Sequence, residues 1–418
     1  MDTIVINGGR RLSGTIAAGG AKNAALPLLF ATLLADGQYR FRNVPRLQDI
    51  ESTILLLEHL DTRVERSGDT LRVFSGGCLH RDAPYDIVRK MRASILCLGP
   101  LLARHGRARV SLPGGCAIGT RPINLHIEAL QQMGAEIEIE HGDVVARAKQ
   151  LHGACIVFEN ATVGGTENLM MAAALARGTT VLENAAKEPE IVDLADCLVK
   201  MGARIEGAGN SVIEIEGVDS LHPCDHTVIP DRIEAGTLLV AGAITGGDVR
   251  VNHCVPGHID ALVQRMAEAG FRIDTGSDWV RVLPCDEWRG VDASTAPYPG
   301  FPTDLQAQFM ALMTIARGTS VITERIFENR FMHVQELVRM GADITPKTQV
   351  AVVRGKPGCL NGAPVMATDL RASASLVLAG LAAEGETIVN RIYHLDRGYE
   401  KLEAKLEKLG ADIERRAA

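Results

Sequence analysis

Residues 306–344 read QAQFMALMTIARGTSVITERIFENRFMHVQELVRMGADI, and this stretch contains the unit from which the rest of the chain is built. Its first part, 306–318, is almost entirely apolar and ends in glycine, which predicts a buried helix. Residues 319–324 (TSVITE) predict a short strand. Residues 333–342 (HVQELVRMGA) are amphipathic and predict a surface helix that ends at Gly-Ala. A second strand is expected to begin at 343–346 (DITP).

The two glycine-containing motifs of this stretch recur six times along the chain. The second one reads LDTRV at 60–64, MGAEI at 133–137, MGARI at 201–205, AGFRI at 269–273, MGADI at 340–344 and LGADI at 409–413. The first one reads ADGQYRFRN at 35–43, RHGRARVSL at 104–112, ARGTTVLEN at 176–184, TGGDVRVNH at 245–253, ARGTSVITE at 316–324 and AEGETIVNR at 383–391. Six equal units divide naturally into three and three. We therefore expect two similar α/β domains, each with helices enclosed by sheets, and a ligand site in the cleft between them.

Composition excludes several classes of function. The chain has 418 residues, 46% of them hydrophobic, and a formal net charge of −7, so no basic field predicts nucleic-acid binding. We expect no membrane span and no secretory signal, because the apolar runs are short and soon meet charge or glycine. The nine cysteines are widely spaced without a CxxC pair, which argues against zinc and against a disulfide framework. We therefore predict a cytoplasmic protein with reduced thiols.

GGAKNAALPLLF at 19–30 places two glycines before Lys22 and Asn23, and an apolar helix follows. A helix N-terminus carries free N–H groups and a partial positive charge, and Lys22 adds a full charge. The stretch predicts an anion site. The alternative is a solvated lysine at a domain junction.

LPGGCAIGTRP at 112–122 places Cys116 in a glycine-rich loop, with Arg121 five residues further on. A cysteine is more often an inert packed thiol than a reactive one. In an irregular loop beside an arginine, however, its thiol would ionise more readily and could donate a proton or act as a nucleophile. Both interpretations stay open on these residues alone.

Asp304 in FPTDLQAQF precedes an apolar helix, so it is either the N-cap of that helix or a general base. Several arginines stand at the ends of predicted elements, and guanidinium groups suit carboxylate and phosphate ligands. They are Arg92, Arg330, Arg371 and Arg397. Each could instead be a surface ion-pair residue, but together with Lys22 they predict a pocket for two anionic groups.

Nine longer stretches carry a resemblance to a known family. They read GAKNAALP (20–27), MRAS (91–94), LPGGCAIGTRP (112–122), ENAAKEPEIVD (183–193), PDRIEAGT (230–237), FPTDLQAQF (301–309), FENRFMHVQEL (327–337), ATDLRASASLVLAG (367–380) and IYHLDRGYEKLE (392–403). From end to end the chain resembles the enolpyruvyl transferases, and among them the UDP-N-acetylglucosamine 1-carboxyvinyltransferase family. The related shikimate-pathway transferases resemble it less, because the GGCAIG loop marks the UDP-sugar enzymes.

The resemblance implies an inside-out α/β barrel fold with two similar domains, each of three βα repeats, and an active site in the interdomain cleft. Residues 22–229 would form one domain, with the Cys116 loop, and residues 1–21 with 230–418 the other. The implied reaction transfers the enolpyruvyl group of phosphoenolpyruvate to the 3′-hydroxyl of UDP-N-acetylglucosamine, by addition and elimination with release of phosphate. It begins peptidoglycan precursor synthesis, and through the cell wall it bears on cell shape and division. Neither a cofactor nor a metal is implied, and a monomer is favoured.

The resemblance also implies roles for single residues. Asp304 would be the base for the sugar hydroxyl, and Cys116 the general acid at C3 of phosphoenolpyruvate, able to form a covalent adduct with it and to be alkylated by fosfomycin. The phosphate side would be bound by Lys22, Arg121 and Arg397. Arg330 and Arg371 would bind the carboxylate, and Asn23 would contact the reacting centre. The matches to positions that hold the UDP-sugar are Arg92, Arg121, Pro122, Ile123, Asn124, Leu125, Asn160, Val163, Gly164, Asp304 and Ile326.

Two positions depart from the family pattern. Asn124 stands where an aspartate is usual near the uracil, and Asn160 where a lysine often meets the diphosphate. Asn124 still offers hydrogen bonds to a uracil edge, whereas Asn160 removes a charge. Two alternatives follow: an enolpyruvyl transferase for another uridine nucleotide such as UMP, and a catalytically silent repeat protein that binds a ligand.

Overall fold

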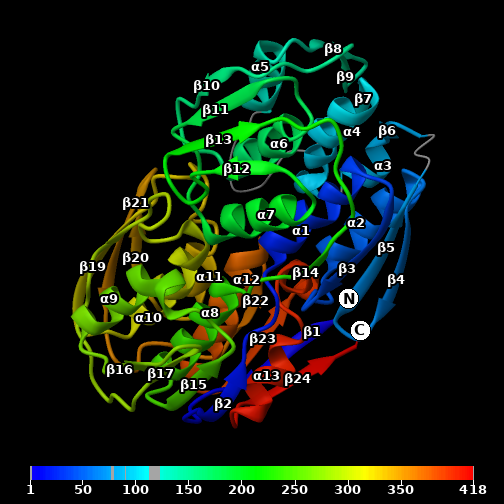
Figure 1. Ribbon diagram of the computed structural model, residues 1–418. Coiled ribbons are helices and arrows are strands. Elements are labelled where there is room, and N and C mark those ends of the chain that lie inside the picture. Colours follow the sequence, from blue (N-terminus) through cyan, green and yellow to red (C-terminus); the bar gives the residue numbers. More distant parts are fainter. Residues whose placement is uncertain (1, 77–79, 90, 113–122, 418) are drawn as a thin grey trace. The chain divides into compact units, whose positions relative to one another are not determined.

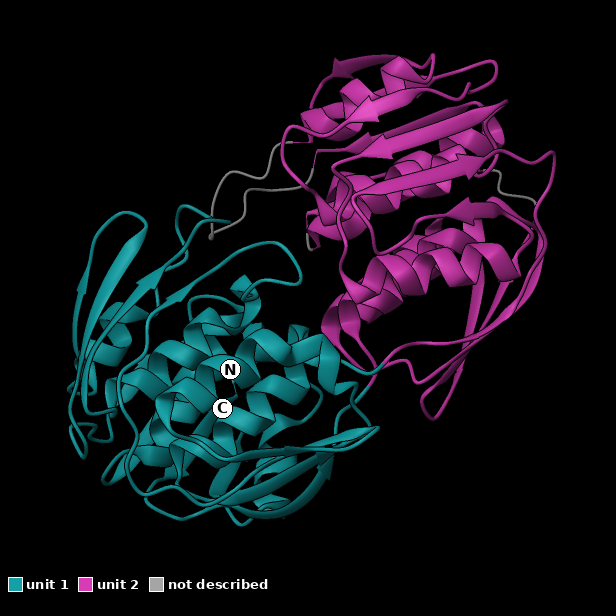
Figure 2. Cartoon of the chain, turned by 60° about the vertical axis from the view of Figure 1, so that its left-hand side comes forward, with its two compact units in different colours: residues 1–19, 117–120, 230–418 teal, residues 20–116, 121–229 magenta. Residues whose placement is uncertain are grey.

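The computed structural model describes residues 2–76, 80–89, 91–112 and 123–417. These residues fall into two compact units, coloured separately in Figure 2. Unit 1 contains the described residues up to Gly19 and those from Pro230 onwards, and unit 2 contains the described residues from Gly20 to Ile229. Within the described residues the chain passes between the units at Gly19–Gly20 and at Ile229–Pro230.

Each unit contains three four-stranded sheets among its described residues, shown in chain colours in Figure 1. In unit 1 their orders are β22 (Pro364–Met366), β23 (Glu386–Asn390), β1 (Thr3–Asn7), β24 (Asp412–Arg416); β16 (Ile273–Thr275), β17 (Trp279–Val282), β15 (Asp248–Asn252), β2 (Ser13–Ala17); and β18 (Ala293–Ser294), β19 (Gly318–Thr323), β21 (Val350–Gly355), β20 (Asp343–Pro346). In unit 2 they are β14 (Asp225–Thr227), β3 (Gly37–Arg42), β5 (Thr70–Ser75), β4 (Arg63–Ser67); β6 (Asp82–Ala83), β7 (Arg107–Ser111), β9 (Asp143–Arg147), β8 (Glu136–Glu140); and β10 (Cys155–Val157), β11 (Thr179–Glu183), β13 (Val212–Glu216), β12 (Arg204–Glu206).

All six sheets have the same mixed pairing. One edge strand pairs parallel with its neighbour, as β18 does with β19, and the remaining pairs are antiparallel. Strand β21 pairs with β19, with Val350 opposite Thr323 and Gly355 opposite Gly318. Along β21, Ala351 and Val353 are buried, and the residues between and beside them are less so. That alternation is typical of a sheet packed on one face only.

The apolar helices of the repeats form the inside of each unit. They are α8 (Arg232–Ile244), α10 (Gln306–Thr314) and α12 (Leu370–Ala382) in unit 1, and α1 (Lys22–Ala31), α4 (Leu98–His105) and α6 (Val163–Ala173) in unit 2. Every residue of α10 is buried. Helices that are apolar nearly all round belong in a core, and Figure 2 shows them with the sheets outside them. The predicted fold class, an α/β fold with helices inside and six repeats, is confirmed.

The amphipathic helices of the repeats bury one face and expose the other. They are α2 (Gln48–His59), α5 (Asn124–Gln132), α7 (Pro189–Lys200), α9 (Asp260–Ala269), α11 (Val334–Arg339) and α13 (Leu402–Lys408). Short connecting elements complete the described chain: α3 (Tyr85–Val88), η1 (Thr32–Leu34), η2 (Arg92–Cys97), η3 (Pro256–Ile259), η4 (Thr303–Leu305) and η5 (Ile392–Arg397).

Backbone geometry explains why glycine recurs in the repeats. The glycine after each buried helix has a positive φ, for example +99° at Gly318, and so has the glycine after each amphipathic helix, for example +103° at Gly341. Side chains rarely adopt this conformation, because Cβ crowds the backbone. Asp61, which replaces the second glycine in the first repeat, still has a φ of +63°. What recurs in each repeat is therefore the backbone conformation of the turn, and not the glycine itself.

Candidate active site

Several of the residues singled out from the sequence lie at or just before the N-terminal ends of buried helices. In unit 1, Asp304 directly precedes α10 and Arg371 lies in the first turn of α12. In unit 2, Lys22 is the first residue of α1 and Val163 the first of α6. Helix N-termini carry unpaired N–H groups and a partial positive charge, so these ends favour anionic ligands.

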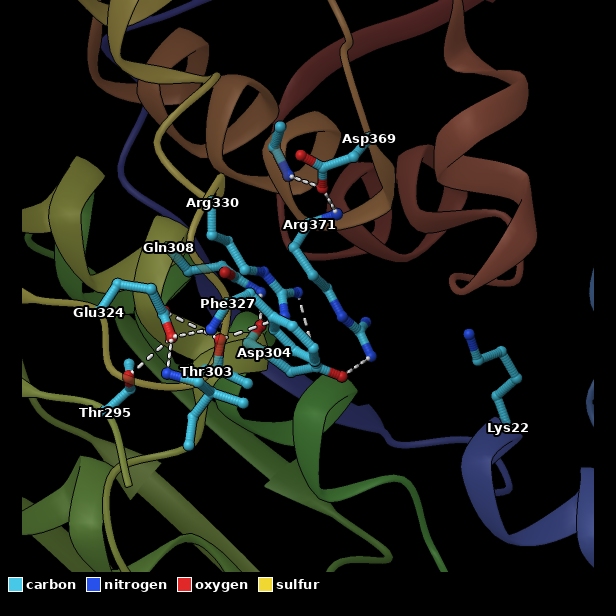
Figure 3. A network of polar contacts seen from close by, with 12 residues as sticks. Lys22, Thr295, Thr303, Asp304, Gln308, Glu324, Phe327, Arg330, Asp369 and Arg371 are labelled. Atoms are coloured by element: carbon cyan, nitrogen blue, oxygen red, sulfur yellow. Dashed lines mark hydrogen bonds and ion pairs between the residues drawn. The ribbon is translucent and has the colours of Figure 1, made fainter. Parts of the chain in front are cut away.

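Asp304 is held by two arginines, as Figure 3 shows. Its Oδ1 accepts a hydrogen bond from Arg330 Nη2, and its Oδ2 accepts one from Arg371 Nη2, both at 2.8 Å. The aspartate side chain is 26% exposed, whereas those of the arginines are only 6% and 4% exposed. The carboxylate is therefore fixed by buried cations and still accessible, as a group that contacts a substrate must be.

The alternative that Asp304 merely caps a helix is wrong. A short 3-10 turn, η4, contains Asp304 and ends at Leu305, and Leu305 is the N-cap of α10 without any side-chain hydrogen bond. The Asp304 carboxylate instead accepts hydrogen bonds from Arg330 and Arg371.

Arg371 is a buried cation with spare hydrogen-bonding capacity. The Asp369 side chain caps α12 by accepting hydrogen bonds from the backbone N–H groups of Arg371 and Ala372. These bonds fix the backbone position from which the Arg371 side chain extends. Burial disfavours the charged guanidinium, but the negative charge of Asp304 and other neighbours outweighs it and raises the pKa of Arg371. Its Nη1 is buried without a hydrogen-bond partner among the described residues. A buried unpaired donor is costly, so this nitrogen suits a ligand oxygen.

A buried polar cluster joins the ends of the three inner helices of unit 1. The Tyr399 hydroxyl lies 2.9 Å from Thr237 Oγ1 of α8 and accepts a hydrogen bond from Gln308 Nε2 of α10 at 3.1 Å. The Arg371 guanidinium of α12 lies 5.4 Å from the centre of the Tyr399 ring. Gln308 Nε2 also donates to the backbone carbonyl of Asp304, at 2.9 Å. This cluster fixes the helix ends on which the arginine and the aspartate are carried.

Arg397 closes η5, two residues before Tyr399, and is partly exposed. The buried ring of Tyr399 anchors this turn in the core. Nearby, burial and the charge of Arg397 lower the pKa of His394. The anchored turn places the partly exposed Arg397 guanidinium at its end.

In unit 2, Lys22 is not a solvated lysine. Its side chain is 12% exposed and its Nζ lies 3.3 Å from Oδ2 of Asp49, itself buried in the first turn of α2. Asn23 follows as the second residue of α1. The predicted apolar helix is confirmed and begins at Lys22 itself, and the ion pair fixes the ammonium at that helix end.

The residues matched to UDP-sugar positions in unit 2 lie at the starts of α5 and α6. Ile123 is the N-cap of α5, where Asn124 and Leu125 are the first two residues, and Val163 and Gly164 begin α6, which Thr162 caps. His126 Nδ1 and Asn168 Nδ2, 2.9 Å apart, join the two helices. The further matched positions are Asn160, exposed in the turn before α6, and Arg92, the first residue of η2. Cys116, Arg121 and Pro122 lie outside the described residues.

Several polar residues of this site were not assigned a role from the sequence, among them Asp49, Gln308 and Tyr399. Asp49 and Gln308 lie within ordinary helix patterns, in which nothing local distinguishes a buried polar partner from a surface residue. For Tyr399 the only signal is its place in IYHLDRGYE beside Arg397. Among the described residues no group of three or more His, Cys, Asp or Glu side chains could hold a metal ion. No helix in the described part of the chain is long and apolar enough to span a membrane.

Comparisons with known proteins agree with this arrangement. The model of the family described as EPSP synthase (3-phosphoshikimate 1-carboxyvinyltransferase) matches residues 6–406. A UDP-N-acetylglucosamine 1-carboxyvinyltransferase from Bdellovibrio bacteriovorus is 64% identical over 412 residues, which cover 99% of this chain and 100% of that protein. One from Myxococcus xanthus is 58% identical over 421 residues, 100% of both chains.

Solved structures show the same fold. The enolpyruvyl transferase NikO from Streptomyces tendae superposes with a TM-score of 0.89 at 28% identity, over 100% of this chain and 99% of that one. EPSP synthase from Acinetobacter baumannii superposes with a TM-score of 0.77 at 18% identity over the full length of both. The family model over residues 6–406 and the full-length identities together show that the chain belongs to the EPSP synthase family and, within it, to the UDP-N-acetylglucosamine 1-carboxyvinyltransferases.

Proposed function

We propose that this protein transfers the enolpyruvyl group of phosphoenolpyruvate to the 3′-hydroxyl of UDP-N-acetylglucosamine and releases phosphate. The observation that supports it most directly is the accessible Asp304 carboxylate between two buried arginines, in a chain 64% identical to an enzyme named for this activity. In the addition step the sugar oxygen bonds to C2 of phosphoenolpyruvate, its proton leaves, and C3 gains a proton. In the elimination step C3 loses a proton and the C2–O bond to phosphate breaks.

Asp304 is the proposed base for the sugar hydroxyl. Its two oxygens accept hydrogen bonds from Arg330 and Arg371. Each oxygen keeps a second lone pair, which can take the hydroxyl proton. Arg371 Nη1, buried without a partner among the described residues, would donate to the carboxylate of phosphoenolpyruvate.

The phosphate side of phosphoenolpyruvate is assigned to Lys22, Arg121 and Arg397, whose charges would stabilise the negative charge that develops on the leaving group. Cys116 is the proposed acid at C3. The proposed binding site of the uridine nucleotide is at the starts of α5 and α6, with Asn124 and Gly164. Their free N–H groups and side-chain amides suit uracil and diphosphate oxygens.

The test is phosphate release by the purified protein with phosphoenolpyruvate and either UDP-N-acetylglucosamine or UMP. The proposal expects saturable release with the sugar nucleotide and a kcat/KM at least about a hundredfold lower with UMP, since UMP lacks the reacting sugar. Phosphate release with UMP but not with UDP-N-acetylglucosamine would show that the acceptor is a different uridine nucleotide. Ligand binding without release from either nucleotide would indicate a silent binding protein.

A further inference from the structure

We propose that Glu324 is a positioning residue for this reaction. One oxygen of its buried carboxylate holds the Ile326–Phe327 backbone, and the other holds the Arg330–Asp304 pair through Thr303. The inference rests on the proposed function, for which it names a residue that acts through others.

Glu324 directly follows β19 and is 1% exposed. A buried carboxylate is strongly destabilising unless hydrogen bonds replace its water, and Glu324 accepts four of them (Figure 3). Its Oε1 accepts from Thr295 Oγ1 at 2.8 Å, from Ile326 N at 2.8 Å and from Phe327 N at 3.2 Å. Its Oε2 accepts from Thr303 Oγ1 at 2.9 Å. The two oxygens therefore serve different parts of the site.

The Oε1 contacts order a segment that has no regular structure. The Glu324 N–H still donates to the Gln349 carbonyl beside β21, at 2.8 Å, whereas residues 325–327 lie beyond β19 and their N–H groups bond to side chains. Glu324 accepts from two of these N–H groups, and the Thr295 hydroxyl oxygen accepts from a third, that of Arg325, at 2.8 Å. Ile326 is a position expected to hold the UDP-sugar. The Glu324 carboxylate thus fixes the backbone of a segment that is expected to contact the UDP-sugar.

The Oε2 contact orients Arg330. A threonine hydroxyl has a single proton, and donating it to Glu324 leaves the Thr303 lone pairs free to accept. Arg330 Nη1 donates to this oxygen at 3.2 Å, while its Nη2 donates to Asp304. The Arg330 guanidinium also lies 5.3 Å from the centre of the Phe327 ring, whose backbone Glu324 holds. Glu324 therefore has two arms, the Oε1 contacts to the Ile326–Phe327 backbone and the Oε2 contact to Thr303. Both act on Arg330, which binds the proposed base.

The arms can be separated by substitution. Thr303→Val keeps the shape of the side chain and removes the hydroxyl link alone, and Thr303→Ser restores the hydroxyl. Glu324→Gln replaces one oxygen by an amide that cannot accept, and it removes the charge from both arms. Thr387→Val is the matched control, because Thr387 is fully buried in the same unit and its hydroxyl has no partner among the described residues.

The experiment measures kcat and KM for both substrates, UDP-N-acetylglucosamine binding by calorimetry, and the melting temperature of each variant. We expect Thr303→Val to lower kcat/KM for phosphoenolpyruvate about tenfold or more while sugar-nucleotide binding stays within about twofold, since a misplaced group affects turnover strongly. Thr303→Ser should recover most of the loss. Glu324→Gln should also weaken sugar-nucleotide binding, and Thr387→Val should match the wild type.

Three outcomes overturn the proposal. In an active wild type, normal kcat/KM for Thr303→Val, or equal losses for its Val and Ser variants, would show that the hydroxyl does not position Arg330. Glu324→Gln changing the melting temperature alone would assign Glu324 a structural role. A wild type without phosphate release would instead overturn the proposed function itself, and this inference with it.

Discussion

Arg371 donates a hydrogen bond to Asp304 at 2.8 Å, although 67 residues separate them in the chain. Asp304 lies just before α10 and Arg371 in the first turn of α12, and these two buried helices pack against each other. The pairing is therefore set by core packing between successive repeats and not by local chain geometry. A substitution in that core would therefore alter the relative positions of Asp304 and Arg371.

Asp304→Asn should abolish most turnover. Asparagine has the same size and still accepts one hydrogen bond, but it cannot take a proton from the sugar hydroxyl. We expect kcat to fall about a hundredfold or more, with KM for UDP-N-acetylglucosamine within about threefold. Phosphate-release kinetics check this. Asp412→Asn, which removes an exposed ion pair with Arg10, is the control, and equal turnover in both variants would remove Asp304 from the chemistry.

Arg371→Lys should impair phosphoenolpyruvate binding. A lysine ammonium cannot donate in parallel to Asp304 and to a second carboxylate as a planar guanidinium does. We expect KM for phosphoenolpyruvate to rise about tenfold or more and KM for the sugar nucleotide to stay nearly constant. Arg281→Lys tests the same exchange at a surface pair with Asp248 and should leave both constants unchanged. An unchanged KM in Arg371→Lys would contradict the assigned role.

Stability should fall as the pH drops from about 6.5 to about 4. Burial lowers the pKa of His333 to about 4, with Arg330 acting in the same direction and Asp369 opposing, and burial beside Arg104 and Arg81 lowers the pKa of His105 to about 4. In this range the unfolded chain binds protons that the native chain does not, so acid favours unfolding. Calorimetric melting temperatures from pH 7.5 to 4.5 measure the trend. His333→Asn should flatten it, and an identical slope would show that His333 is not responsible.

Gly341→Ala should destabilise the chain more than Gly318→Ala. Both glycines have positive φ, +103° and +99°, so each alanine costs about 1–2 kcal/mol of backbone strain. A Cβ at 341 would also lie 2.5 Å from the Cys359 carbonyl oxygen, whereas one at 318 meets nothing within 4 Å. Overpacking should add about 1–3 kcal/mol, measurable by urea unfolding. Equal midpoints for the two variants would contradict this.

Cys116→Ser should lose most turnover, because an alcohol is a far weaker acid than a thiol at neutral pH. Fosfomycin should alkylate Cys116 in the wild type, and intact-mass and peptide spectrometry would locate the adduct. Labelling of the exposed Cys155 instead, or near-normal turnover of Cys116→Ser, would count against the proposed acid.

The repeats were predictable from sequence because they are local. The glycines at 318 and 341 recur where the backbone must take a positive φ, and the apolar helices follow from composition alone. The partners of Asp304 were not predictable in this way, since the pairing with Arg371 depends on how α10 packs against α12.

Glu324 shows the same limit more sharply. At the end of the strand TSVITE, a glutamate is indistinguishable in sequence from one that faces solvent, yet it is among the most buried charged residues of the described chain. Its role comes from Thr303 and Thr295, which meet it only in the folded unit. The capping interpretation of Asp304 failed because a single 3-10 turn was inserted before α10.

The position of β1 has a consequence for how the chain is made. It is an inner strand of its sheet, and its partners β23 and β24 lie at residues 386–390 and 412–416. During synthesis β1 therefore precedes both of its partners by most of the described strands, and Ile4 and Ile6, both fully buried in the finished fold, stay uncovered until β23 and β24 are made. The described strands of unit 2 are all synthesised in between, so unit 2 can fold while β1 still lacks both of its partner strands.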